Sequence, residues 1–73
     1  VQNMVTASDN PLTHQEMSVL KAAADGQSTK QIAESLFLSD GTVRNYLSAI
    51  FSKLGVHNRL EAVNLAKTNK WLS

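Results

Sequence analysis

The segment from Ser39 to Leu54, SDGTVRNYLSAIFSKL, constrains the fold of this chain more than any other stretch. Its apolar side chains recur at helical spacing and line one side of a helix: Val43, Leu47, Ile50 and Leu54. The opposite side has no large apolar residue and carries Gly41, Arg44, Asn45, Ser48 and Ser52. Such a helix buries one face in a core and leaves the other face free for a partner.

Start and stop signals place three more helices around this one. Two residue pairs have the spacing of a capping box, namely Thr13 with Glu16 and Ser28 with Gln31. A further cap and two helix stops are supplied by Asn58, Gly26 and Gly55. The predicted helices span residues 14–24, 29–36, 40–54 and 59–68. No strand-like alternation is present, so the sequence predicts an all-α, four-helix domain over residues 11–73, preceded by a linker over residues 1–10.

Composition restricts the function classes. The chain has 73 residues and no cysteine, which excludes disulfide frameworks and Cys-based zinc sites. His14 and His57 have no second ligand in metal-binding spacing, and the Ser and Thr residues mostly serve as caps. We therefore expect neither an enzyme nor a bound metal or cofactor. These 73 residues contain no apolar run long enough to span a bilayer and no signal-peptide pattern, so we expect no membrane partner and a cytoplasmic location.

The two central helices are joined by a tight turn, Phe37-Leu38-Ser39, which makes them a helix-turn-helix candidate. The side chains of Arg and Asn pair bidentately with the edges of guanine and adenine. We therefore expect Arg44, Asn45 and Ser48 to read bases in the major groove of duplex DNA. The alternatives are a solvated Arg44 and a merely tolerated Asn45. The formal net charge of +1 is weak for a nucleic-acid binder, so the placement of the charges has to support this interpretation.

The run LTHQEMSVLKAAADGQSTKQIAESLFLSDGTVRNYLSAIFSKLGVHNRLEAV closely resembles the LuxR-type helix-turn-helix domain, the output domain of NarL/FixJ response regulators. The matching pieces are Leu12-Thr13 with Glu16, Val19-Leu20, Gly26, Lys30-Gln31-Ile32-Ala33, Leu38-Ser39, Thr42-Val43-Arg44, Ile50, Lys53-Leu54, Val56, Arg59 and Ala62-Val63. The resemblance covers roughly residues 12–66. It implies that the third helix enters the major groove and that the fourth helix supplies a dimer contact.

The resemblance also implies which residues touch DNA. Its base-reading positions fall on Arg44, Asn45 and Ser48, and its backbone-contacting positions fall on Thr29, Lys30, Gln31, Thr42 and Lys53. Many members have Lys at the position of Ser48 and His at that of Tyr46, so the target sequence of a relative does not transfer. From this chain's own pattern, Ser39, Gly41 and Tyr46 complete the set of backbone candidates.

Several of these residues have a second interpretation. Gly41 either lets a helix N-terminus approach phosphate closely or is a tolerated first-turn glycine. Tyr46 either aims its hydroxyl at the DNA backbone or only packs on the core. Lys30 lies at the unfavourable end of its helix dipole, which a facing phosphate explains, whereas Lys53 suits its helix end without one.

The fourth helix carries a polar stripe with one leucine. Ala62, Leu65 and Ala66 are expected to face the core, with Val63 at the boundary. Leu60, Asn64 and Lys67 form a separate stripe, which we expect to be a weak two-fold interface. A single exposed leucine needs no explanation, and it is the resemblance that favours the interface.

The sequence therefore predicts a sequence-specific, dimeric DNA-binding domain. We expect it to be the C-terminal output domain of a bacterial two-component response regulator, cut from its receiver domain near residues 1–10 because the chain starts at Val1. One alternative is a complete stand-alone regulator, with Met4 as a start. A different class, a helical protein-interaction module, is disfavoured because the bare face of the third helix offers no apolar anchor.

Overall fold

A computed structural model describes residues 10–72 of the chain. It contains α1 (His14–Ala24), α2 (Thr29–Leu36), α3 (Asp40–Leu54) and α4 (Arg59–Thr68), with no strand among the described residues. The all-α prediction is thereby confirmed, and the predicted helix bounds agree with the observed ones. The predicted linker lies outside the described residues except for Asn10, whose side chain accepts a hydrogen bond from the Leu12 N–H at 2.9 Å.

Each helix begins where its cap predicts. Both capping boxes form: the Thr13 hydroxyl accepts from the Glu16 N–H, and the Ser28 hydroxyl accepts from the Gln31 N–H. In each box the side chain of the third helical residue also accepts a hydrogen bond from the backbone N–H of the cap residue. Ser39 and Asn58 cap α3 and α4 in the same position. Because these bonds satisfy N–H groups that no helical carbonyl reaches, they fix the first turn of each helix locally.

The end of α2 differs from the other helix ends. Both α2 and α3 end on a residue with a left-handed backbone. In α3 this residue is Gly55, at φ 69°, whereas in α2 it is Phe37, at φ 59°. The sequence predicts an apolar turn at Phe37-Leu38, but the two side chains part: Leu38 is partly buried against the core, and Phe37 is 94% exposed. A left-handed backbone costs a non-glycine residue roughly 1–2 kcal/mol, so the turn is strained at a residue that buries nothing.

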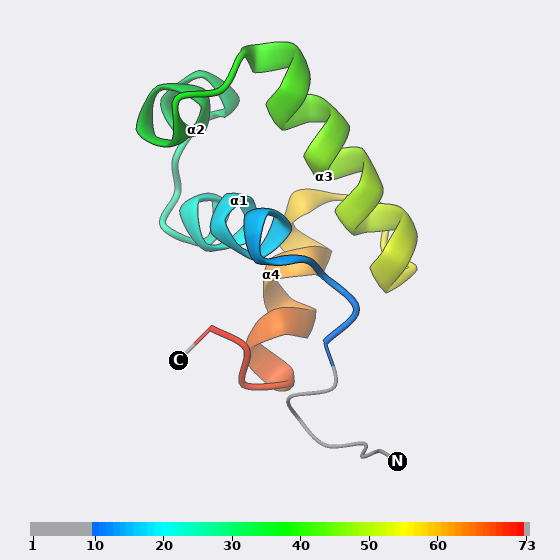
Figure 1. Ribbon diagram of the computed structural model, residues 1–73. Coiled ribbons are helices and arrows are strands. Elements are labelled where there is room, and N and C mark those ends of the chain that lie inside the picture. Colours follow the sequence, from blue (N-terminus) through cyan, green and yellow to red (C-terminus); the bar gives the residue numbers. More distant parts are fainter. Residues whose placement is uncertain (1–9, 73) are drawn as a thin grey trace.

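The core lies among all four helices. Its fully buried large side chains are Val19, Leu20, Ile32, Val43 and Ile50. Both α2 and α4 pack on α1 and on α3, and α2 and α4 lie on opposite sides of α1 (Figure 1). Trp71 and Leu72 lie partly buried against this core. Among the described residues, no helix has the length and hydropathy needed to cross a membrane.

Candidate nucleic-acid interface

The outer face of α3 is polar and unengaged. Val43, Leu47 and Ile50 are buried, whereas Gly41, Arg44, Asn45 and Ser48 are exposed. Within residues 10–72, the side chains of Arg44, Asn45 and Ser48 make no hydrogen bond and no ion pair. The structure therefore places the three predicted base-reading residues together on one exposed face, with their donors and acceptors available to a partner.

The start of α3 is held by Ser39. Its hydroxyl accepts a hydrogen bond from the Thr42 N–H at 3.1 Å and donates one to Thr42 Oγ1 at 2.9 Å. The Thr42 hydroxyl thus retains its own proton for another acceptor. A Cβ at Gly41 would meet no atom within 4 Å, and its φ is not positive, so nothing in the domain itself requires glycine there. Both interpretations of Gly41, a close approach to phosphate and a tolerated first-turn glycine, are compatible with this open space.

The first turn of α2 is the other half of the predicted surface. Acidic residues occupy the first turns of α1, α3 and α4, but none occupies that of α2, which carries the exposed Lys30 instead. Gln31 uses its side-chain oxygen on the Ser28 N–H at 2.8 Å, which leaves its amide NH₂ free to donate. A helix N-terminus without a carboxylate attracts anions, because the N–H groups of its first turn that the cap does not satisfy have no internal acceptor.

Tyr46 lies at the edge of the α3 face. Its ring is partly buried against the core, and it lines a shallow hollow of about 250 Å³ together with Glu16, Thr42, Asn45 and Ala49. Packing thus accounts for the ring of Tyr46. The hydroxyl makes no hydrogen bond within residues 10–72 and remains a candidate donor.

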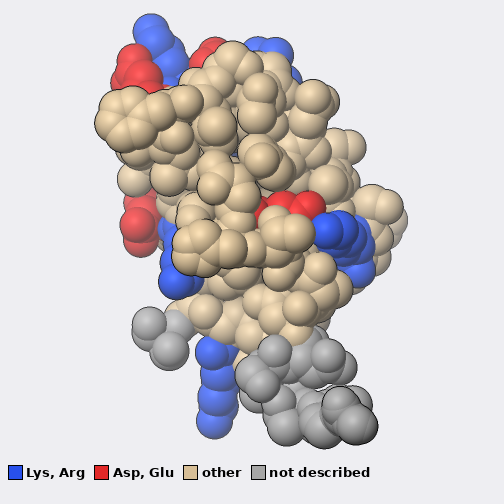
Figure 2. Space-filling view, in the orientation of Figure 1, with Lys and Arg blue, Asp and Glu red and all other residues tan. Residues whose placement is uncertain are grey.

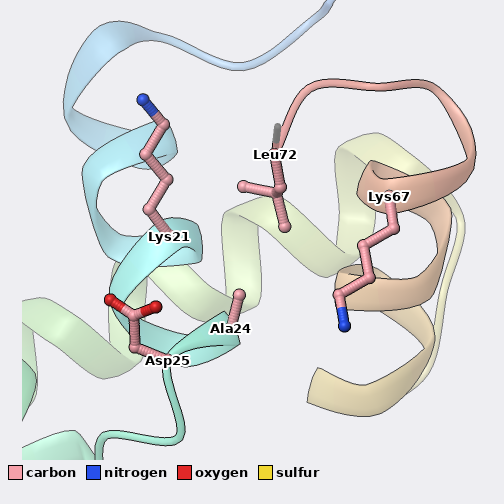
Figure 3. A pocket seen from close by; sticks show the side chains of 5 residues that line it. All are labelled: Lys21, Ala24, Asp25, Lys67 and Leu72. Atoms are coloured by element: carbon pink, nitrogen blue, oxygen red, sulfur yellow. The ribbon is translucent and has the colours of Figure 1, made fainter.

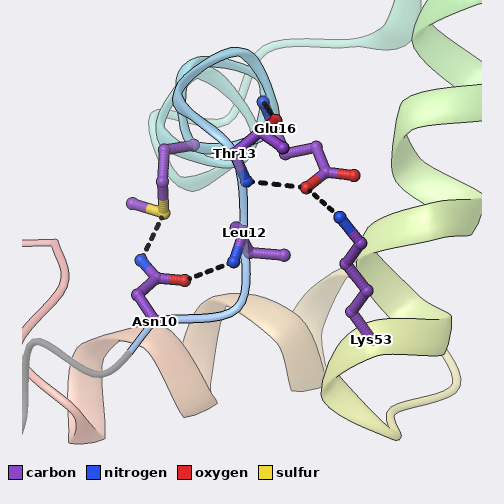
Figure 4. A network of polar contacts seen from close by, with 6 residues as sticks. Asn10, Leu12, Thr13, Glu16 and Lys53 are labelled. Carbon is purple, nitrogen blue, oxygen red and sulfur yellow. Dashed lines mark hydrogen bonds and ion pairs between the residues drawn. The ribbon is translucent and has the colours of Figure 1, made fainter. Parts of the chain in front are cut away.

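Lys53 is engaged within the domain. Its Nζ lies 2.8 Å from Glu16 Oε1, which also accepts from the Thr13 N–H at 2.8 Å, so one carboxylate oxygen joins the start of α1 to the end of α3 (Figure 4). The resemblance implies that Lys53 contacts the DNA backbone. In the free domain its side chain instead forms this ion pair with Glu16 and remains 38% exposed. Glu16 is 4% exposed. Its position four residues before Leu20, on the apolar side of α1, was a sequence signal that its charge needs a partner.

The environment of Glu16 keeps it ionised. Burial by itself raises the pKa of this carboxyl group. The hydrogen bonds from Lys53 and the Thr13 N–H, together with the charge of Lys53, outweigh burial and hold the pKa below its ordinary value. Glu16 and Lys53 are therefore a charged pair at neutral pH.

The stripe on α4 is exposed as predicted. Leu60 is 69% exposed, and Asn64 and Lys67 are exposed beside it. One detail of the prediction is wrong: Val63 is buried and Leu65 is only partly so, because α4 turns Val63 rather than Leu65 into the core. Lys67 also lines a hollow of about 360 Å³ between α1 and α4, opposite Lys21 and with Leu72 between them (Figure 3).

Arg59 was not among the predicted site residues. Its guanidinium Nη1 donates to the Gln27 carbonyl at 2.5 Å, and Nη2 lies 3.4 Å from Thr29 Oγ1. A cation at the first position of a helix opposes the helix dipole. That misfit, which drew attention to Lys30, was the signal that would also have found Arg59.

Charge is spread rather than concentrated. Figure 2 shows Lys and Arg side chains scattered over the visible face, with Asp and Glu among them, in keeping with the net charge of +1. Any attraction for nucleic acid therefore depends on individual residues and helix ends rather than on one large basic patch.

Comparisons with known proteins identify the family of this chain. The model of the family described as bacterial regulatory proteins, luxR family, matches residues 10–66. The chain is 52% identical to the transcriptional regulatory protein DesR of Bacillus subtilis over 62 residues, which are 85% of this chain and 31% of that protein. It is 44% identical to the fimbriae Z protein of Salmonella typhimurium over 64 residues, 88% of this chain and 30% of that one.

A solved structure shows the same fold. The response regulator ChrA of a heme-sensing two-component system matches with a TM-score of 0.79 and 38% identity, over 84% of this chain and 30% of that one. The chain thus spans about a third of the length of the relatives it matches. The family match and these likenesses together establish that the chain belongs to the luxR family of bacterial regulatory proteins, as a LuxR-type helix-turn-helix DNA-binding domain.

Proposed function

We propose that this domain is the C-terminal output domain of a response regulator and binds duplex DNA as a homodimer, with α3 in the major groove. The observation that carries the proposal is the bare face of α3, where Arg44, Asn45 and Ser48 have no partner within residues 10–72. These side chains would read base edges. The first turn of α2 and the start of α3 would hold the phosphates, through Thr29, Lys30, Gln31, Ser39, Gly41 and Thr42, with Tyr46 and Lys53 at the margin.

The relatives support the response-regulator context. ChrA is a response regulator of a two-component system, and DesR is a transcriptional regulatory protein. By analogy, a receiver domain would precede this one in the whole protein, and its phosphorylation would supply dimer affinity. Such a domain acts on chromosomal DNA by binding rather than by catalysis, and it would therefore work in the cytoplasm.

The interaction with DNA should depend strongly on salt. Each phosphate neutralised by a cationic group contributes about −0.9 to the slope of log affinity against log salt concentration. Lys30 and the unblocked start of α2 are the main candidates here. Fluorescence anisotropy with a labelled duplex at several salt concentrations measures the slope. An affinity that does not change with salt, or no binding at low salt, would contradict DNA binding through these groups.

Dimerisation should be weak without DNA and should depend on Leu60. The stripe of Leu60, Asn64 and Lys67 offers one sizeable apolar side chain, far less than the ~1,200–2,000 Å² buried in stable complexes. Two half-sites on one duplex raise the effective concentration enough to compensate. We expect Leu60→Asp to remain folded, to bind a single half-site normally and to lose cooperative binding to paired half-sites.

Circular dichroism and gel shifts with one-site and two-site duplexes test this. Phe37→Asn is the matched control, since it removes the other large exposed apolar side chain of residues 10–72 and suits a left-handed backbone. It should retain cooperativity. If Leu60→Asp unfolds the domain, or if it binds paired sites as cooperatively as the wild type, the interface does not lie on this stripe.

A further inference from the structure

The two helices assigned to phosphate binding and to dimerisation are not close neighbours in the fold. Within the described chain, α2 and α4 each pack on α1 and α3, but their backbones do not approach each other closely. Among the hydrogen bonds of residues 10–72, those of Arg59 connect the two helices. Arg59, the first residue of α4, donates to the Gln27 carbonyl and lies within hydrogen-bond distance of the Thr29 hydroxyl.

The two acceptors flank the N-cap of α2. Gln27 precedes Ser28 and Thr29 follows it, so the guanidinium holds the chain on both sides of the cap. The Gln27 peptide is itself anchored, because its N–H donates to the Ala22 carbonyl at 3.2 Å. Guanidinium donors are coplanar and rigid, so two such bonds fix an orientation that a single ammonium group cannot.

The position of Arg59 has no local advantage. Its side chain forms no ion pair within residues 10–72, and a cation at the start of α4 opposes the helix dipole. What its contacts stabilise lies on α2, at the turn that carries Lys30 and Gln31. One donor of each terminal guanidinium nitrogen is used there, so the bonds of Arg59 within residues 10–72 all go to this segment.

We propose that Arg59 is a positioning residue for DNA binding, whose guanidinium ties α4 to the N-cap region of α2 and holds the phosphate-facing turn in register with α3. This inference rests on the proposed function, since it assumes that the first turn of α2 faces DNA. It assigns Arg59 an action through Thr29 and the Gln27 carbonyl rather than a contact of its own.

Two substitutions separate positioning from charge. Arg59→Lys keeps the positive charge but loses the paired guanidinium donors, whereas Arg59→Gln loses both the charge and the paired donors. If Arg59 positions α2, both variants should bind a single half-site duplex roughly tenfold more weakly than the wild type, the scale of one charge-assisted hydrogen bond. Both should keep the wild-type salt slope, because no phosphate contact is lost. Lys21→Gln removes one exposed positive charge on α1 and should match the wild type.

Amide hydrogen exchange by NMR gives a readout that does not need DNA. The Gln31 N–H, bonded to the Ser28 hydroxyl, should exchange faster in Arg59→Lys and Arg59→Gln, while the core amide of Ile50 should keep its protection. Rescue of affinity by Arg59→Lys alone, or a salt slope reduced by about one in Arg59→Gln, would show a direct phosphate contact and overturn the proposal. Unchanged affinity in both variants would overturn it as well.

A second route covers loss of folding. If an Arg59 variant is unfolded by circular dichroism, Thr29→Val removes one acceptor while Arg59 remains, and Thr29→Ser restores the hydroxyl. We then expect Thr29→Val to speed exchange at Gln31 and Thr29→Ser to restore the wild-type rate; no effect of Thr29→Val on this rate overturns the tie. A wild-type domain that binds no duplex contradicts the proposed function itself, whereas normal wild-type binding with rescue by lysine contradicts only the role of Arg59.

Discussion

Replacing Arg44 by alanine is expected to lower affinity for the preferred duplex by about 5- to 150-fold while leaving affinity for a scrambled duplex nearly unchanged. A bidentate contact to a base edge contributes ~1–3 kcal/mol of discrimination, and each 1.4 kcal/mol is about a factor of ten. Arg44 is the long side chain at the centre of the bare α3 face and is not held by any other group in residues 10–72. The preferred duplex is first selected from a random pool with the wild-type domain.

Lys30→Ala is the matched comparison, because it removes one exposed cation from the start of α2 instead of α3. It should weaken binding to both duplexes by a similar factor and reduce the salt slope by about one. Arg44→Lys adds a second test, since lysine keeps the positive charge but lacks the two parallel N–H donors with which arginine pairs with guanine. If Arg44→Ala and Lys30→Ala weaken both duplexes alike, Arg44 contacts the backbone and the base-reading face has been assigned wrongly.

Replacing Glu16 by alanine is expected to destabilise the domain by about 1–3 kcal/mol, the scale of a weakened helix cap plus a lost tie between helices. Glu16 Oε1 accepts from both the Thr13 N–H and Lys53 Nζ, and the residue is 4% exposed. The ion pair itself contributes at most about 1 kcal/mol of this, because the Lys53 side chain is 38% exposed and water screens it. Thermal melts by circular dichroism measure the loss, at roughly 4–8 °C per kcal/mol for a domain of this size.

Glu16→Gln separates the cap from the charge. Glutamine still accepts from the Thr13 N–H in a capping box but carries no charge for Lys53, so we expect a loss of about 1 kcal/mol or less at pH 7. Should Glu16→Gln destabilise as much as Glu16→Ala, charge pairing rather than capping dominates.

The effect of charge also has a defined pH dependence. The pKa of Glu16 is lower in the folded domain than its ordinary value of 4.5, so acidification protonates the unfolded chain first. The stabilisation is therefore fully present above the ordinary value and is lost as the pH falls through the lower pKa of the folded state. The difference between the wild type and Glu16→Gln should shrink in that range, and a difference that grows on acidification would falsify this account.

Lys53 affects both the stability of the domain and its proposed contact with DNA. Its amine is paired with Glu16 in the free domain, and a phosphate contact would compete with that pair. Lys53→Gln should therefore lower stability slightly, and any effect on DNA affinity has to be read after correction for folding. Lys30, which has no such partner within residues 10–72, is the cleaner probe of phosphate contact.

The sequence by itself determined the helices and their faces. The cap formed by Thr13 and Glu16 joins residues that are three apart, and Gly55 ends its helix through its own backbone angles. Both signals involve only residues within one helical turn, so they can be recognised in the sequence. The 3.6-residue period then separates the buried side of α3 from the side that carries Arg44. Resemblance to a family supplied the roles of these faces, and the family match confirmed the family itself.

Only the tertiary structure decided which side chains meet across the core. Glu16 and Lys53 are 37 residues apart in sequence, and Arg59 reaches Gln27 over 32 residues, so neither contact leaves a periodic signal. The exposure of Phe37 and the burial of Val63 likewise depend on how α2 and α4 are rotated against α1 and α3. Local bonds fix where a helix begins and ends, but its rotation and its long side-chain ties are set by the packing of all four helices together.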